Sequence, residues 1–487
     1  MMTNIKYGKL KALILATLFV CTVSSCNDWL DVSPKSQIKE EEHFKTEDGY
    51  KDQLTGVYTA MTNKNMYGLQ MGIGFTEVLS QSYDVDANGG WLYPSEYNYT
   101  ETSTRIRIDS IWSNTYRCIA NLNVMLRNIN KADTTIFSNN NYNVYKGEAL
   151  GLRGFLHLEM MRLFASSPAY DANANGVPYV TEYSPELVSQ KTVNATMQLV
   201  LNDLLEARKC LGSDSLKTSA TPFSFRSSRI SHFNYYAAVA SLARAYLWIG
   251  DKANALKYAN EIVAIAESSA LNKPFRWVDA TSVEAAQDYE TDHAFTPEFI
   301  FQLKINGWED IANYYFKAAS TTESLSPSEN KAREIYEVDS KAYGNDYRFL
   351  KGYQIDGDKK YLCKLWYYEN SAYNNVYPMI RMTEAFYIAA ECLKDSDPER
   401  AATLLNEVRD ARNLGSYPLE TNLSAAEIQT EIWKEYRKEF VGEGGQLFFY
   451  YKRLNASEIK GAGVAPSKAI YVLPIPSVDQ ELGGYTN

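Results

Sequence analysis

Residues that commonly carry catalysis or bind metals are scarce in this sequence. Its 487 residues include 4 histidines and 6 cysteines, and no two cysteines form a C-x-x-C pair. It contains no H-E-x-x-H, G-x-S-x-G, P-loop or G-x-G-x-x-G pattern. These absences argue against a metalloprotease, a serine hydrolase, an NTPase and a dinucleotide-binding enzyme. Glycoside hydrolysis needs only a pair of carboxylates, and with 59 acidic residues the sequence does not exclude such a pair. No pattern in the sequence identifies one.

A block of basic residues is missing as well. The formal net charge is −10, and lysine and arginine are not gathered in any one segment. Nucleic-acid-binding proteins depend on such positive surfaces to neutralise phosphates. The sequence therefore argues against nucleic acid as the main partner, and equally against electrostatic binding to anionic lipid.

Long apolar runs are confined to the N-terminus. Residues 12–23 form an apolar run that follows three lysines and is too short to span a bilayer permanently. Small residues directly before Cys26 resemble a bacterial lipoprotein signal. We therefore expect residues 1–25 to be a signal peptide and Cys26 to be lipidated, so that the mature protein is anchored to a membrane but does not span it. An ordinary secretory signal, with Cys26 as a bystander, is the alternative.

Tyrosine, in contrast, is abundant, and small residues follow a helical pattern. The chain has 37 tyrosines, whose rings suit core packing as well as binding of sugars or peptides. Residues 231–268 predict two helices, because apolar and small residues recur at three- and four-residue steps. Gly250 can end the first helix and Asp251 can cap the second. The spacing resembles a tetratricopeptide hairpin, which needs similar neighbours to bury its apolar face.

Comparable patterns predict the rest of a mostly α fold. Further helices are expected at 46–62, 111–130, 145–164, 195–211 (capped by Asn194), 379–413, 424–441 and 446–454. They supply about four tetratricopeptide-like hairpins, with a scaffold at about 46–65, 111–268 and 379–454. Loop-rich insertions occupy about 68–104 and 270–377. A small β element is expected in the second insertion, from a strand at 298–305 and a hairpin around Asp356-Gly357. We expect residues 26–487 to form a single domain.

Seven short stretches occur in an order that is known from one family. They are CNDWLDVSP at 26–34, GEALGLRGF at 147–155, GVP at 176–178, RMTEAFYIAAE at 381–391, LLNEVRDAR at 404–412, EYRKEFVGEG at 435–444 and LPIP at 473–476. The set resembles the SusD/RagB family of nutrient-binding outer-membrane lipoproteins of Bacteroidetes. One departure is the Gly444-Gly445-Gln446 sequence, where the family commonly has an arginine.

The resemblance implies a function and a location. It implies a lipid-anchored protein at the cell surface that binds oligosaccharide or polysaccharide. It further implies delivery of the glycan, without catalysis or a required cofactor, to a partner SusC-like TonB-dependent transporter. Oligopeptide capture by the same fold is a second hypothesis, and a surface glycoside hydrolase is a distant third.

Aromatic and polar side chains alternate in the first insertion, which makes it the main candidate for a ligand site. Aromatic faces cover the C–H face of a sugar, and carboxylates or amides bond its hydroxyls. The candidates are Tyr83, Asp84, Asp86, Asn88, Trp91 and Tyr93, with Trp91 first because Gly89-Gly90 leaves the backbone beside it exposed. The second insertion adds Trp277, Trp308 and Tyr314. The alternative for each aromatic residue is that it packs its insertion onto the helices.

One loop fits the pattern of an EF-hand calcium site. Asp171, Asn173, Asn175 and Glu182 occupy ligand positions 1, 3, 5 and 12, with Gly176 at the turn. Pro178 weakens the match, because an apolar residue normally stands at its position. The pattern therefore raises a structural Ca²⁺ as a hypothesis only.

Overall fold

The structure is a computed structural model that describes residues 39–218, 229–317, 322–356 and 359–487. The expected signal peptide and Cys26 lie outside the described residues. Contacts divide the chain into two units, residues 1–46 and 47–487. The described part of the first unit contains the short helix α2 (Glu40–His43). All further description concerns the second unit.

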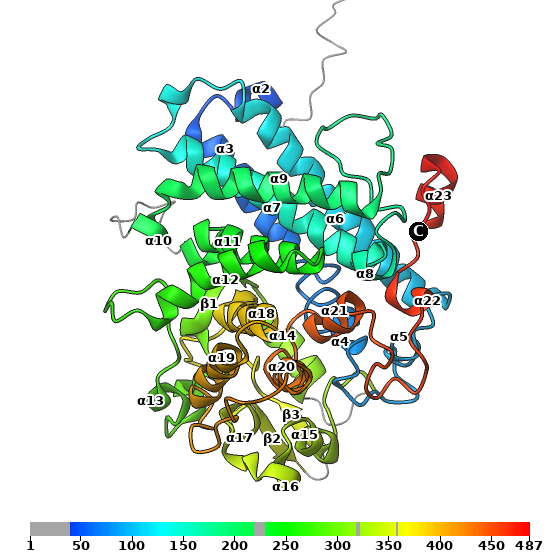
Figure 1. Cartoon of the computed structure of the whole chain (residues 1–487). Helices are drawn as coiled ribbons and strands as arrows, with labels where there is room; N and C mark the ends of the chain where they lie inside the picture. Colours follow the sequence, from blue (N-terminus) through cyan, green and yellow to red (C-terminus); the bar gives the residue numbers. More distant parts are fainter. Residues whose placement is uncertain (1–38, 219–228, 318–321, 357–358) are drawn as a thin grey trace, which may run out of the picture. The chain divides into compact units, whose positions relative to one another are not determined.

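Eight helices form the scaffold of this unit (Figure 1). They are α3 (Glu47–Met61), α6 (Thr102–Ile129), α7 (Asn141–Phe164), α9 (Val193–Cys210), α11 (Tyr235–Trp248), α12 (Lys252–Glu267), α18 (Met382–Leu393) and α19 (Pro398–Asp410). Each helix packs against the next, and they pair as four hairpins. The last hairpin also contacts α20 (Ala425–Glu439), which in turn contacts α21 (Gln446–Arg453). Helix accounts for 56% and strand for 5% of the structure, which confirms the prediction of a mostly α fold.

The α11–α12 hairpin has the turn that the sequence predicts. Gly250 has a φ of 81°, a left-handed conformation that favours glycine. The Asp251 side chain accepts a hydrogen bond from the Asn254 N–H and caps α12. Ala243, Ala255 and Ala259 are fully buried, so the two helix backbones approach closely. None of the described helices is both long and apolar enough to cross a membrane.

Several predicted helix starts are displaced, and capping explains two of them. Thr192, not Asn194, caps α9, because its side chain accepts a hydrogen bond from the Ala195 N–H. Helix α6 begins at Thr102, nine residues before the predicted start, because Glu101 accepts a hydrogen bond from the Thr104 N–H. Because glutamate is not a common N-cap residue, this start was hard to predict from the local sequence.

The β element consists of two small antiparallel sheets. Strand β1 (Phe299–Lys304) pairs with β4 (Val376–Arg381), and β2 (Tyr353–Asp356) pairs with β3 (Lys359–Leu362). The first strand and the hairpin are confirmed, although the predicted hairpin arms, 347–356 and 359–368, are longer than β2 and β3, and the first arm begins as helix α17 (Tyr347–Leu350). The expected helix from residue 379 is wrong for its first three residues, which complete β4.

Short helices complete the insertions and the connections. They are α4 (Phe75–Val78), α5 (Leu92–Ser95), α8 (Pro168–Asp171), α10 (Ser215–Thr218), α13 (Ala280–Val283), α14 (Trp308–Ala312), α15 (Glu329–Ile335), α16 (Val338–Lys341), α22 (Lys468–Tyr471) and α23 (Ser477–Gly483). The C-terminal segment returns to the end of α7, where the Leu473 N–H donates to the Leu163 carbonyl at 3.0 Å.

A buried ion network joins the second insertion to the C-terminal helices. Its cations are Arg348, Lys364, Arg381, Arg409, Arg412 and Lys438, and its carboxylates are Glu298, Glu337, Asp346, Glu435, Glu439 and Glu443. The two lists are equally long, so the network is formally neutral. At its centre, Glu439 contacts three arginines, which hold the pKa of this carboxyl well below its usual range although burial opposes them. Burial of paired charges in this way favours one arrangement of the elements, because any unpaired partner would be costly.

Candidate ligand-binding surface

The two insertions meet along a line of contacts that we call the insertion seam. It consists of Asp84 and Gly89–Trp91 from the first insertion and Tyr315 and Thr322–Lys331 from the second. The Asp84 N–H donates to the Ser326 carbonyl at 3.0 Å, and the Gly90 N–H donates to the Glu323 Oε1 at 2.7 Å. A Cβ on Gly89 would lie 2.0 Å from the Thr322 carbonyl oxygen, so only glycine allows the two backbones to come this close.

Trp91, the first candidate from the sequence, lies beneath this seam. Its side chain is fully buried, and its ring is packed edge-to-face against Tyr315 with 5.9 Å between centroids. The Arg107 guanidinium covers the ring at 4.2 Å from the centroid. The flanking glycines do not expose Trp91, because the second insertion covers them. In this structure Trp91 supports the surface and offers no open face.

Arg107 and Glu323 are polar groups of this region that sequence reasoning missed. The Arg107 guanidinium donates long hydrogen bonds of 3.5 Å to the Gln70 Oε1 and the Gly90 carbonyl. Partial burial lowers the pKa of Arg107 below its ordinary value, and nearby Tyr315 and Glu323 oppose this shift. Arg107 belongs to a scaffold helix and Glu323 to the opposite insertion, so no local pattern joined them to Trp91.

Two predicted aromatic residues do present an open face. Tyr93, on α5, is 42% exposed, and Tyr314 is 48% exposed. Tyr314 packs edge-to-face on Tyr315 with 4.9 Å between ring centroids, and this contact helps to hold the exposed Tyr314 ring in place. Asp86 and Asn88 are also exposed, in a turn in which the Asp86 Oδ1 accepts a hydrogen bond from the Asn88 N–H at 2.8 Å. These side chains combine apolar faces with acceptors and donors.

The other predicted aromatic residues pack inside the protein. Tyr83 is 3% exposed and Trp308 is 2% exposed. The Trp308 Nε1 donates to the Leu365 carbonyl at 2.6 Å. Trp277 is half-buried and packs against Phe386 of α18, with 4.9 Å between ring centroids. For these three residues the structure favours the packing role that was the alternative.

The seam carboxylate Asp84 is held in its ionised form. Partial burial raises its pKa, but hydrogen bonds from the Ser328 N–H and from Lys331 outweigh burial and lower the pKa below the ordinary value. The Lys331 Nζ lies 2.9 Å from the Asp84 Oδ1. A general acid for glycoside hydrolysis needs a raised pKa. Asp84 is therefore suited to accepting hydrogen bonds and unsuited to donating a proton.

The EF-hand-like loop is extended along α9 and does not close on itself. Near the start of α9, the Ala172 and Ala174 carbonyls accept hydrogen bonds from the Asn194 and Val193 N–H groups. Farther along, the Thr181 carbonyl accepts from Arg153, which pairs with Asp203 of α9. Ten helical residues separate Val193 from Asp203, about 15 Å.

The predicted calcium ligands are consequently spread out. Asp171 lies at the start of this path and Glu182 near its far end. Within the described parts of the chain, no group of three or more histidine, cysteine, aspartate or glutamate side chains is placed to hold a metal ion. The Ca²⁺ hypothesis therefore receives no geometric support at this loop.

Comparisons with known proteins agree with this architecture. A family model described as "starch-binding associating with outer membrane" matches residues 28–247, and the SusD family model matches residues 310–473. The SusD-like protein P38 of Formosa agariphila is 21% identical over 96% of both chains. A SusD superfamily protein from Bacteroides thetaiotaomicron has a TM-score of 0.69 at 22% identity and covers 90% of this chain and 98% of its own. The surface glycan-binding protein A from Bacteroides uniformis has a TM-score of 0.64 at 19% identity, with coverages of 90% and 98%.

The two family models together reach from the first residues after the lipoprotein-like signal to the LPIP stretch. They include five of the seven stretches on which the resemblance was based in full, and the first and the last of the seven in part. The description of the first model places the family at the outer membrane. With its four helical hairpins and two small sheets, the chain belongs to the SusD/RagB family.

Proposed function

We propose that this protein binds a glycan at the cell surface through Tyr93 and Tyr314 and through Asp86 and Asn88, the polar residues of the turn next to the insertion seam. The observation that carries the proposal is the exposure of these two tyrosines, one on each of the two insertions that meet at the seam, together with the exposed Asp86 and Asn88 of the first insertion. Membership of a family whose members bind glycans supports it. SusD-family glycan-binding proteins are not catalysts, which agrees with binding without cleavage.

The proposed site would hold a sugar by two kinds of contact. A tyrosine face covers the C–H face of a pyranose ring, and its hydroxyl remains available to water or to the ligand. Exposed carboxylate and amide groups, such as Asp86 and Asn88, bond the hydroxyls at the ring edge. The buried Trp91 and Arg107 would hold the backbone of the first insertion in place beneath these contacts.

A panel of ligands tests the site directly. We expect the double variant Tyr93→Ala/Tyr314→Ala to lose about thirty-fold in affinity for the bound glycan, measured by calorimetry, because each of the two stacking contacts contributes on the order of 1 kcal/mol. The matched control is Tyr170→Ala/Tyr417→Ala, which removes two tyrosines of 50% and 41% exposure from α8 and from the loop after α19. Unchanged affinity in the first variant would contradict the site.

The same panel separates the alternatives. A peptide pool measured beside polysaccharides tests oligopeptide capture, which the fold alone does not distinguish from glycan binding. Analysis of the bound glycan for shorter products tests hydrolysis, and any product would contradict a pure binding function. An α-glucan belongs in the panel because of the description of the first family model.

We further propose delivery of the glycan to a SusC-like TonB-dependent transporter by a protein that is lipid-anchored through Cys26. Residues 26–487 would then form the mature domain. Family membership supports both steps. Loss of fatty-acid labelling in Cys26→Ala would support the anchor. Co-purification of a TonB-dependent transporter from detergent-solubilised outer membranes would support the partner, and its absence under conditions that retain the anchored protein would count against it.

A further inference from the structure

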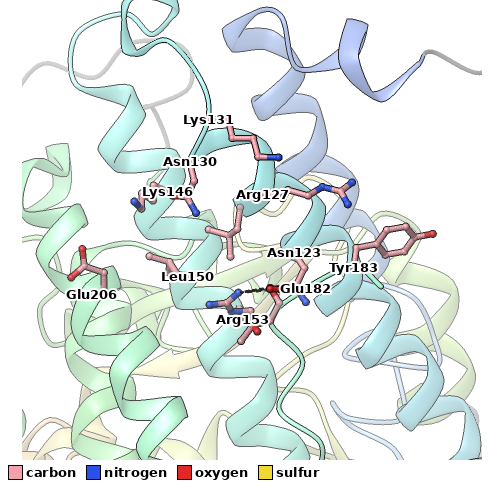
Figure 2. Close-up of a pocket in the computed structure, with 12 residues that line it drawn as sticks. Asn123, Arg127, Asn130, Lys131, Lys146, Leu150, Arg153, Glu182, Tyr183 and Glu206 are labelled. Carbon is pink, nitrogen blue, oxygen red and sulfur yellow. Dashed lines mark hydrogen bonds between the residues drawn. The ribbon is translucent and has the colours of Figure 1, made fainter. Parts of the chain in front are cut away.

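A second surface, far from the insertion seam, has the form of a binding pocket. It is an open cavity of about 530 Å³ between α6, α7, α9 and the loop at residues 181–183 (Figure 2). This volume is in the range of small-molecule sites. Arg107 at the seam and Arg127 at the pocket are twenty residues apart on the same continuous helix, about 30 Å. The pocket is therefore separate from the proposed glycan surface.

The loop that forms one wall of the pocket is fixed to the helices. The Tyr116 hydroxyl donates to the Pro178 carbonyl at 2.8 Å, and the Val180 N–H donates to the His157 Nε2 at 3.1 Å. The Asn123 Nδ2 donates to the Val180 carbonyl at 3.0 Å. These bonds hold the backbone on both sides of residue 179, and the Thr181 carbonyl, at the start of the wall, accepts a hydrogen bond from Arg153 at 3.4 Å.

The deep part of the pocket is neutral. Arg153 is 8% exposed and forms two hydrogen bonds with the Asp203 carboxylate, at 2.7 and 2.8 Å. Its charge is thus balanced by the protein. Leu126 and Leu150, which are 4% and 8% exposed, add apolar surface. A ligand would meet an apolar and hydrogen-bonded floor there.

The rim, in contrast, carries two lysines. Figure 2 shows Lys131 and Lys146 around the upper part of the pocket, above Leu150 and Arg153. Of the two lining carboxylates, Glu206 lies 3.3 Å from Lys209, which is not a lining residue. Glu182 is exposed at the edge. These two lysines belong to a protein whose formal net charge is −10.

An aromatic ring stands beside the cations. Tyr183 is 61% exposed, and the Arg127 Cζ lies 6.0 Å from its ring centroid. An exposed ring next to an apolar floor suits the C–H face of a sugar. The surrounding lysines suit an anionic substituent on that sugar, because charge-assisted hydrogen bonds are the stronger ones.

We propose that this pocket is a second saccharide site that binds an acidic sugar unit, one that carries a carboxylate or a sulfate group. The floor and Tyr183 would contact the ring, and Lys131 and Lys146 would contact the anionic group. The site does not depend on Tyr93 or Tyr314, so it can be tested separately from the function proposed above.

The test compares two charge-removing variants by calorimetry with defined probes. The probes are an oligogalacturonate for the carboxylate, a sulfated galactan oligosaccharide for the sulfate, a neutral maltooligosaccharide and polyglutamate. We expect Lys131→Ala/Lys146→Ala to weaken binding of an acidic oligosaccharide by about ten-fold or more. The control Lys51→Ala/Lys191→Ala removes the same charge from one half-buried and one exposed lysine elsewhere, and should leave binding unchanged.

Salt dependence and probe selectivity decide the outcome. Affinity for the acidic probe should fall as ionic strength rises from about 0.05 to about 0.5 M, since exposed charges are screened. Binding of only one acidic probe would show whether the pocket recognises a carboxylate or a sulfate. Binding of both would show that it recognises negative charge in either form. Absence of binding by the unmodified protein, equal affinity in the lysine variant, or equally tight binding of polyglutamate would overturn the proposal.

Discussion

Glu298 offers a direct test of the buried ion network. Its carboxylate is fully buried, lies 2.5 and 2.7 Å from two nitrogens of Arg412, and lies 3.5 Å from Arg381. The substitution Glu298→Gln keeps the size of the side chain but leaves the network with one uncompensated positive charge. Breaking a buried pair in this way typically costs about 3–5 kcal/mol.

The structure places the expected cost at the lower end of that range. Arg412 keeps a second partner, because the Glu439 carboxylate lies 2.7 Å from it. We therefore expect a decrease of about 3 kcal/mol in the free energy of unfolding, which is a shift of about 1 M in the urea midpoint for an m-value near 3 kcal/mol per M. Tryptophan fluorescence can follow the transition, since the chain has 8 tryptophans.

Two further variants make the result specific. The exposed pair of Arg333 and Asp339 lies outside the buried network, and Asp339→Asn should leave the midpoint unchanged within error. The double variant Glu298→Gln/Arg412→Gln should lose less than the sum of the single variants, since the two side chains are partners. A Glu298→Gln protein that unfolds at the same urea concentration as the unmodified protein would refute the reasoning.

Three other predictions each concern a single residue. Burial raises the pKa of Glu77 from 4.5 to about 7. Its contribution to stability is therefore greatest below about pH 4.5 and is lost as pH rises towards 7. In the unmodified protein the free energy of unfolding should fall by up to roughly 3 kcal/mol across that window, and in Glu77→Gln this fall should be absent. Gly89→Ala should force the insertion seam apart at Thr322, and calorimetry should show weaker glycan binding. Asp251→Ala removes the cap of α12 and should lower the free energy of unfolding by about 1 kcal/mol in a urea titration.

Most of the scaffold could be predicted because its signals are local. The α11–α12 hairpin is specified by the helical period of its apolar residues, by Gly250 and by Asp251, all within about forty residues. Ser424 and Glu427, three residues apart, form a capping box that starts α20 at the predicted position. Strand β4 was missed because its partner, β1, lies more than seventy residues earlier. A short apolar run such as 377–380 reads equally well as helix or strand until the partner is known.

The candidate site was harder to predict, for a physical reason. Whether Trp91 is exposed depends on the second insertion, which contributes Tyr315 and Glu323 from more than two hundred residues away. Sequence alone could identify the aromatic residues but could not decide which of them the other insertion would cover. The arginines and glutamates of the ion network posed a similar problem, because charged residues on a helix usually lie at the surface.

The two proposed sites are tied to different parts of the fold. The pocket is formed by α6, α7 and α9, which are consecutive helices of the scaffold, so its contacts join residues that are close in the sequence. The insertion seam depends on the second insertion, which is held to the scaffold by the β1–β4 pairing and by Glu298 in the ion network. Contacts of this kind tend to be lost together when the element that attaches them is destabilised. Substitutions in the ion network should therefore disturb the insertion seam more than they disturb the pocket. The buried ion network, although it does not contact the ligand, would thus keep the insertion seam in the form that binds glycan.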